Sequence, residues 1–404
     1  MDNKTERIFS VSLISYNQPD YWREAVSSVL AQDYPAIDLV FSDDGSPGFS
    51  KSEVEEFIES SRGKNLVSYT VIEHEENIGT MKNLNDADAA CTGYYVTHLE
   101  GDDAFATNHV LSDYAKAIES APKSALGVFG KRIACDEKLR ILPDTSNYVQ
   151  NYFSIDEMVE MHSMTPRNLY RYLVIKGNCR LPWGSSAFRF ADYRRYLPLD
   201  TRVSYIGDWP FFLKITREGH TMSFANVDAI LYRRGGISTS TELTPLKKKY
   251  LSDRAKVYAY EIFPFINEYF SPEERVKIFE TYSSIQRTAP SETDLIAAST
   301  AIAQDKHTAA LVIANMTNLY RSNCLNNASA SSKAQTDWIQ QLQEGKDWLE
   351  DQYRKLTTEN SELRNNARKA AKDVQAIKDS SLWKIGRAIT SVPRAIKKIA
   401  RGAR

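Results

Sequence analysis

Strand-like and helix-like segments alternate over residues 8–134, and this alternation restricts the first part of the chain to a small set of folds. Runs typical of strands span 8–14, 37–41, 66–72, 94–99 and 125–133. Between them, apolar residues recur at helical spacing over 19–30, 52–60, 80–91 and 107–120. Such alternation predicts a sheet of parallel type with helices on both faces. In that architecture ligands bind at the carboxyl ends of the strands.

Acidic residues gather at two of those strand ends. Asp43 and Asp44 follow the second run, and Glu100, Asp102 and Asp103 follow the fourth. Like charges this close repel, so the arrangement calls for a positive partner. Mn²⁺ or Mg²⁺ is such a partner, because it binds one or two carboxylates together with phosphate oxygens. A solvated turn explains most single Asp–Asp pairs, but two clusters at neighbouring sheet positions favour a metal and nucleotide diphosphate site.

Size and charge exclude some classes of protein. A chain of 404 residues predicts two or more folded units. A formal net charge of −1 gives no bulk attraction to nucleic acid, so no nucleic-acid partner is expected. The four cysteines lack metal-type spacing, which favours reduced thiols in the cytoplasm. The polar N-terminus has no signal-peptide core and no run of 18 apolar residues exists, so we expect any membrane contact to be peripheral.

Four segments, in order, resemble the family 2 glycosyltransferases, the inverting enzymes of GT-A fold that include many of bacterial cell-surface polysaccharide synthesis. They are VSLISYNQPDYWREAVSSVLAQDYP (11–35), LVFSDDGS (39–46), ENIGTMKNLNDADAACTGYYVTHLEGDD (76–103) and GDW (207–209). The resemblance covers about residues 8–240. It implies a Rossmann-like mixed sheet with helices on both faces.

The resemblance also implies roles for individual residues. Tyr16 would stack on the nucleotide base, and Asp44, with Asp43 beside it, would accept a hydrogen bond from the base or ribose. Lys82 would lie near the diphosphate. Asp102 would touch the ribose or sugar, and Asp103 would bind the metal. Glu100 stands where the more common D-x-D-D form of the family's motif has its first Asp, and it is a candidate sugar contact. Asp208 would be the general base.

Physical chemistry agrees with the role of Asp208. An inverting transfer needs one carboxylate to take the proton of the acceptor hydroxyl as its oxygen attacks the anomeric carbon. A retaining or inverting hydrolase would instead need two carboxylates flanking the bond. Asp is also common at helix N-termini, and both roles are compatible at this position.

Two further sets of residues are candidates. The family often has a histidine three residues after the Tyr of its Tyr-Arg segment, which resembles residues 227–240. Here that position is Gly235, so Arg233 or Arg234 is expected to substitute. Trp183 and Trp209 could line an acceptor groove, since sugars stack on aromatic faces, although packing in the core explains them equally well.

The chain is expected to have five parts: a GT-A catalytic domain (1–240), a helical domain (241–322), a linker (323–335), a coiled coil (336–379) and a basic amphipathic tail (380–404). Leu342, Leu349, Leu356 and Leu363 repeat every seven residues, which favours a homo-oligomeric coiled coil over a long surface helix. The tail interleaves cations with Trp383 and aliphatic residues and holds no acid, which favours a membrane surface over an acidic protein partner.

Together these features predict a metal-dependent glycosyltransferase, cytoplasmic and peripheral to the inner face of the cell membrane. It would move a sugar from a nucleotide-sugar donor to a glycan or lipid-linked acceptor in cell-surface polysaccharide synthesis. Two alternatives are a nucleotidyltransferase, which usually has a glycine-rich loop where ISYNQPD (14–20) stands, and a non-catalytic coiled-coil scaffold with a degenerate transferase domain.

The tail gives a first testable prediction. The full chain should sediment with anionic lipid vesicles, and the bound fraction should fall as salt is added, because each tail cation contributes on the order of 1 kcal/mol near anionic lipid and salt screens it. A chain ending at Ser380 should stay in the supernatant. Equal sedimentation of the two chains would refute a membrane role for the tail.

Overall fold

The computed structural model describes residues 7–143, 154–234 and 242–288, together with helical positions 347, 351, 354, 355, 358, 361, 362, 365, 366, 368, 369 and 372. The chain divides into two compact units, 1–315 and 316–404. The expected linker and basic tail lie outside the described residues, as does most of the expected coiled coil. Among the described residues, no helix has the length and apolar character that crossing a membrane requires.

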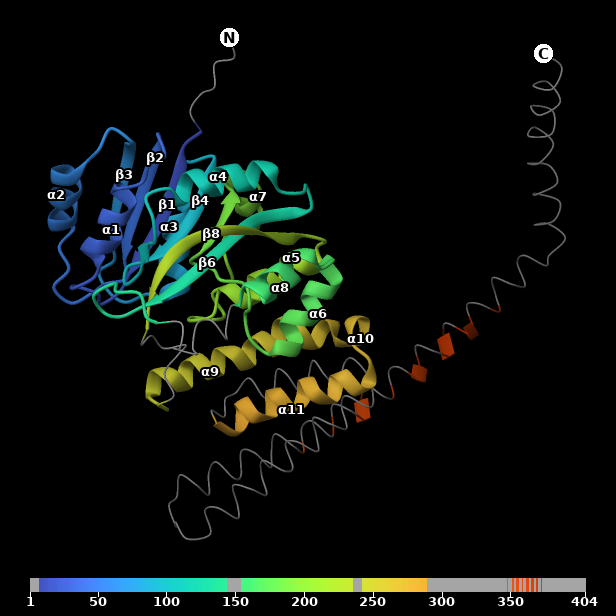
Figure 1. Cartoon of the computed structure of the whole chain (residues 1–404). Coiled ribbons are helices and arrows are strands. Elements are labelled where there is room, and N and C mark those ends of the chain that lie inside the picture. Colours follow the sequence, from blue (N-terminus) through green and yellow to red (C-terminus); the bar gives the residue numbers. More distant parts are fainter. Residues whose placement is uncertain are drawn as a thin grey trace, which may run out of the picture. The chain divides into compact units, whose positions relative to one another are not determined.

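One mixed sheet of eight strands organises the first unit (Figure 1). Its order is β3-β2-β1-β4-β7-β6-β8-β5. The strands are β1 (Phe9–Ser15), β2 (Ile37–Asp43), β3 (Leu66–Glu73), β4 (Tyr95–Glu100), β5 (Ala104–Phe105), β6 (Ala125–Cys135), β7 (Ser186–Arg189) and β8 (Thr221–Arg233). The first four are parallel, whereas β7 runs antiparallel to both β4 and β6. The expected mixed α/β architecture is therefore confirmed.

Alternation along the strands separates an apolar face from a polar one. Phe9, Val11 and Leu13 of β1 share one core with the buried faces of α1 (Trp22–Leu30), α2 (Lys51–Ser61) and α4 (Val110–Ser120). The intervening side chains point the other way, toward α3 (Thr80–Ala90). There Asp38 is buried but accepts hydrogen bonds from Ser10 and Ser68, both at 2.7 Å. One face of the sheet is thus a conventional core and the other carries a buried polar layer.

The remaining helices lie beside β6 and β8, except the short helix α7, which follows β7 and packs on it (Figure 1). They are α5 (Ile155–Ser163), α6 (Pro166–Lys176), α7 (Phe190–Tyr193), α8 (Asp208–Arg217), α9 (Pro245–Val257), α10 (Ile266–Tyr269) and α11 (Pro272–Thr288). Helix α6 packs on α8, and α9 packs on α11. After α9 the chain passes through a π-turn over Tyr258–Ile262 and a 3-10 turn over Phe263–Phe265, where Pro264 cannot donate a helical hydrogen bond.

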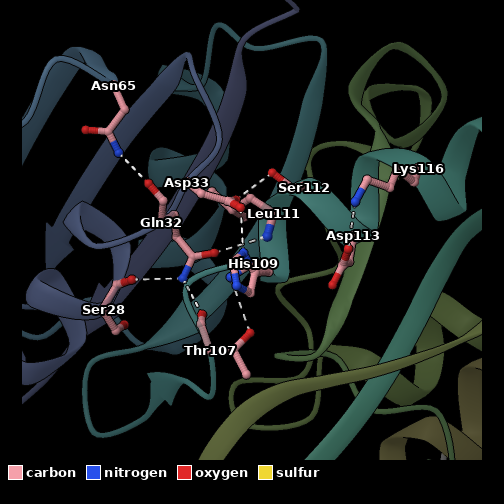
Figure 2. Close-up of polar contacts among 10 residues, drawn as sticks. All are labelled: Ser28, Gln32, Asp33, Asn65, Thr107, His109, Leu111, Ser112, Asp113 and Lys116. Atoms are coloured by element: carbon pink, nitrogen blue, oxygen red, sulfur yellow. Dashed lines mark hydrogen bonds and ion pairs between the residues drawn. The ribbon is translucent and has the colours of Figure 1, made fainter.

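A buried glutamine joins the end of α1 to the start of α4 (Figure 2). The Gln32 side chain is 3% exposed. Its amide nitrogen donates to the carbonyls of Thr107 (2.6 Å) and Ser28 (3.1 Å), and its oxygen accepts from the backbone N–H of Leu111 (3.1 Å). Because Leu111 is in the first turn of α4, Gln32 caps that helix from outside it. This junction ties the loop between β5 and α4 to the end of α1.

We predict that Gln32→Met lowers the free energy of unfolding by about 2 kcal/mol, because three backbone groups, among them the buried N–H of Leu111, lose their partner. Lys116→Gln is the matched control: Lys116 pairs with Asp113 on α4 but is 76% exposed, so its loss should change stability by less than about 0.5 kcal/mol. Urea denaturation of the two variants measures both values. Equal stability of Gln32→Met and the parent would show that the junction contributes nothing.

Candidate active site

A cavity of about 500 Å³ opens at the carboxyl ends of the parallel strands. Strands β1, β4 and β6, helix α3, and the loops at 178–183 and 205–208 contribute its walls, and Leu246, Tyr250 and Arg254 of α9 add a further side. The candidate residues that line it are Tyr16, Asp44, Glu100, Asp102, Asp103, Trp183, Asp208 and Trp209. The chain thus brings both acidic strand ends and the start of α8 to one space.

Asp44 lines the cavity and also anchors a loop. One of its oxygens accepts from the backbone N–H groups of Ile78 (2.7 Å) and Gly79 (3.2 Å), and the other accepts from the Asn77 side chain (3.1 Å). The adjacent Gly45 has a φ of +70°, and a Cβ there would lie 2.3 Å from the carbonyl carbon of Glu76. Only glycine fits this close approach between the two loops. Tyr16, by contrast, is 47% exposed at the rim.

The three carboxylates after β4 lie in unequal surroundings. Burial raises the pKa of Asp102 to about 6, and the charge of Glu100 adds to the effect. Asp103 is 2% exposed, and burial followed by the charges of Asp102 and Glu100 holds its pKa well above its ordinary value. The backbone N–H of Arg233 donates to Asp103 at 3.0 Å. The cluster is therefore costly to ionise without added positive charge.

Sequence reasoning missed the cation that the fold brings to this cluster. Arg132, on β6, lines the same cavity. Burial alone would lower the pKa of its guanidinium, but the charges of Glu100, Asp103 and Asp208 raise it. The available signal was the pair Lys131-Arg132 inside an otherwise apolar strand. Strand alternation sends one of these side chains to each face, and the one that faces the cavity is Arg132.

Asp208 begins α8, as expected, and its carboxyl faces the cavity. Its oxygen accepts from the backbone N–H of Trp209 at 2.7 Å. Burial raises the pKa of Asp208 above its ordinary value, while that hydrogen bond and the charge of Arg132 offset part of the rise. A carboxylate with a raised pKa is a stronger base than one in water, which suits proton abstraction.

Four candidate residues do not line the cavity. Asp43 is buried, with its two oxygens accepting from the backbone N–H and hydroxyl of Ser46, each at 2.7 Å. Lys82 is exposed on α3, because the neighbouring Met81 and Asn83 occupy the face toward the cavity.

The two arginines after Tyr232 also lie elsewhere. Arg233 is buried and joins the acidic loop to α1, because its guanidinium donates to the Asp102 carbonyl and pairs with the Glu24 carboxylate. Arg234 lines a separate surface hollow near Cys135 and Asp136. Neither arginine therefore lines the cavity that holds the acidic cluster.

The two tryptophans differ from each other. Trp183 lies against the ring of His98, with centroids 4.7 Å apart, and Trp209 is fully buried against Tyr258. Both are therefore packing residues that also reach the cavity.

The donor set partly suits a hard divalent cation. Asp103 offers carboxylate oxygen, the ligand type that Mn²⁺ and Mg²⁺ prefer. Within the described ranges, however, no cluster of three or more His, Cys, Asp or Glu residues could hold a metal ion by itself. These residues fit an ion that is also coordinated by oxygens of a bound ligand, such as those of a diphosphate.

Comparison with known proteins finds a family match over part of the chain. Residues 10–196, a little under half of the chain, match the family model described as glycosyl transferase family 2. An uncharacterized protein of Mycobacterium tuberculosis is 30% identical over 119 residues, which are 29% of this chain and 33% of that one. An uncharacterized glycosyltransferase of Haemophilus influenzae is 26% identical over 96 residues, 24% and 28% of the two chains. The matches thus span about a third of the length of these relatives.

Solved structures show a weaker likeness. Staphylococcus aureus TarS 1–349 in complex with UDP-GlcNAc has a TM-score of 0.43 and 15% identity, covering 79% of this chain and 92% of that one. Mannosyltransferase PcManGT from Pyrobaculum calidifontis, in complex with GDP-Man and Mn²⁺, has a TM-score of 0.43 and 16% identity, covering 86% of each. At these scores the structural likeness carries no argument about this chain. The family match supports a glycosyltransferase domain over residues 10–196.

The raised pKa of Asp102 predicts a pH-dependent stability. Its folded-state pKa of about 6 exceeds the ordinary 3.8, so the folded protein holds this proton more tightly. The resulting stabilisation is complete below about pH 4 and is lost as the pH rises through 6. Asp102→Asn should therefore unfold at a higher urea concentration than the parent at pH 7.5, and the gap should be clearly smaller at pH 4.5. A gap that does not change with pH would contradict this assignment.

Proposed function

We propose that this chain is an inverting glycosyltransferase that moves a sugar from a nucleotide-sugar donor to an acceptor hydroxyl. The observation that carries the proposal is the cavity that brings the acidic cluster after β4 together with Asp208 at the start of α8. An inverting transfer needs that combination: a binding region for the donor diphosphate, and a separate base for the incoming alcohol. The family match over residues 10–196 supports the same reaction class.

In this proposal, residues at the carboxyl ends of the strands bind the donor. Tyr16, half exposed at the rim, offers a ring on which a nucleotide base can stack. Asp44 and the loop it anchors at 77–79 form the adjacent wall. Asp103 would hold Mn²⁺ or Mg²⁺ together with the diphosphate, and the ion would stabilise the negative charge of the leaving nucleoside diphosphate. Asp102 lies beside it, where a ribose or sugar hydroxyl can donate to its carboxylate.

Asp208 is the general base of the chemical step. Its carboxylate removes the proton of the acceptor hydroxyl as that oxygen attacks the anomeric carbon, and the bond to the nucleoside diphosphate breaks on the opposite face of the sugar. Arg132 lies among the same acids and favours the ionised form of Asp208 that this step requires. The hydrogen bond from Trp209 N–H fixes one carboxylate oxygen and leaves the group oriented for the transfer.

The acceptor and the location of the protein are proposals from the sequence alone. A glycan or lipid-linked acceptor of cell-surface polysaccharide synthesis suits an enzyme bound to the inner face of the cell membrane by a basic tail. A homo-oligomeric coiled coil over 336–379 would set the number of catalytic domains at that surface. Both segments fall almost entirely outside the described residues.

The central test is donor hydrolysis. With Mn²⁺ and a panel of nucleotide sugars, the parent should release nucleoside diphosphate from at least one donor. Asp103→Ala should lower that release by about 100-fold or more, because removing a transition-state charge contact costs roughly 3 kcal/mol. Asp113→Asn, an exposed acid on α4, is the control and should match the parent.

Two outcomes would contradict the proposal. Metal-dependent release that is unchanged in Asp103→Ala would remove this residue from the mechanism. Release from no donor, together with no donor-dependent thermal shift in the presence of Mn²⁺, would remove the glycosyltransferase itself.

A further inference from the structure

Buried polar atoms without partners concentrate around the cavity. His98 Nδ1, Glu100 Oε2 and Trp183 Nε1 are each buried, and in the described part of the chain none of them has a hydrogen-bond partner. All three residues line the cavity. Native proteins pair nearly all buried polar groups, so an unpaired set in one place indicates a ligand that completes it. Two of these residues, His98 and Glu100, belong to β4, and Trp183 lies in the loop before β7 with its ring against that of His98.

His98 is the most informative of the three. It lies on β4, is 2% exposed, and directs Nε2 at the carboxylate of Asp88 on α3, 3.1 Å from Oδ1. The hydroxyl of Tyr193 donates to Oδ2 of the same carboxylate at 2.6 Å. Asp88 and Tyr193 are both fully buried. Because an ionised carboxylate only accepts hydrogen bonds, the imidazole proton is on Nε2.

The surroundings of the ring then determine the state of Nδ1. Trp183 lies 4.7 Å away and tilted by 31°, Tyr193 lies at 5.4 Å and Phe188 at 6.2 Å, all measured between ring centroids. These rings hold the imidazole in one orientation. They also offer no acceptor for a proton on Nδ1. In the neutral ring with its proton on Nε2, Nδ1 is therefore a hydrogen-bond acceptor with a fixed position.

The mixture of acceptors and donors identifies the class of ligand. His98 Nδ1 and an ionised Glu100 oxygen can only accept, whereas Trp183 Nε1–H can only donate. A phosphate group, which accepts only, would leave the first two unsatisfied. A hydroxyl both donates and accepts, so adjacent hydroxyls on one ring satisfy all three atoms. The geometry thus favours an uncharged, polyhydroxylated ring at this end of the cavity.

We propose that His98 binds a hydroxyl of the transferred sugar through Nδ1, and that Asp88 and Tyr193 are positioning residues that fix the imidazole as the Nε2–H tautomer. The inference rests on the proposed glycosyltransferase function and adds to it the residue that distinguishes donors by one hydroxyl. A donor that lacks this hydroxyl leaves Nδ1 buried and unpaired, and is rejected for that reason.

The first experiment needs no turnover. Nitrogen-15 NMR of histidine-labelled protein, with the His98 signals assigned by their loss in His98→Gln, should show a neutral ring with the proton on Nε2. In Asp88→Asn the amide oxygen keeps the Tyr193 contact and the amide nitrogen faces His98, so the proton should move to Nδ1. A proton on Nδ1 in the parent would overturn the inference, whatever the protein catalyses.

The second experiment measures selectivity. UDP-glucose, UDP-N-acetylglucosamine and GDP-mannose are the probes, and the donor with the highest kcat/KM is compared with its monodeoxy analogues. One analogue should lose about tenfold or more in kcat/KM with the parent and less than about threefold with His98→Gln, whose amide still reaches Asp88. His220→Gln, outside the cavity, should discriminate as the parent does.

The outcomes separate the two proposals. If the parent turns over a donor and His98→Gln discriminates among the analogues as strongly as the parent, His98 does not bind the sugar and the inference fails alone. If the parent releases nucleoside diphosphate from no probe, and donor addition leaves the His98 nitrogen signals unmoved, both the proposed function and the inference are refuted.

Discussion

The site depends on one electrostatic constraint: several carboxylates must be held together where water is largely excluded. Two like charges 4 Å apart repel by roughly 4 kcal/mol at the effective dielectric constant of a protein surface. Arg132 offsets part of this cost by reaching the cavity from β6, near Glu100, Asp103 and Asp208. The acids at β4 and α8 thus depend on Arg132 of β6, a strand that carries no acid of the site. The pKa values of Asp102, Asp103 and Asp208 remain raised, so a further cation would stabilise the ionised cluster.

The sequence predicted the features that local patterns determine. The strand and helix order over residues 8–134, the acidic strand ends and the position of Asp208 at the start of α8 all follow from periodicity and local motifs. Arg132 and the Asp88–His98 pair could not be found this way. They act through partners 10 to 105 residues away, and a strand pattern does not say which face meets a cavity.

The antiparallel strand β7 and helix α9 show a second limit of sequence reasoning. β7 enters the sheet between β4 and β6 from a loop region without clear periodicity, so its pairing could not be anticipated. α9 lies beyond the boundary expected at residue 240, yet it supplies Leu246, Tyr250 and Arg254 to the cavity. Asp43 and Lys82 illustrate the reverse case, since a motif names residues whose side chains a turn or a helix face directs elsewhere.

The three hydrogen bonds from Asp44 to residues 77–79 make one carboxylate serve both the wall of the site and the loop behind it. Any substitution of Asp44 therefore disturbs two segments at once, so a loss of activity in such a variant does not report on ligand contact alone. A homologue that changes the aspartate would have to rebuild the Asn-Ile-Gly turn, so we expect the two segments to covary among homologues.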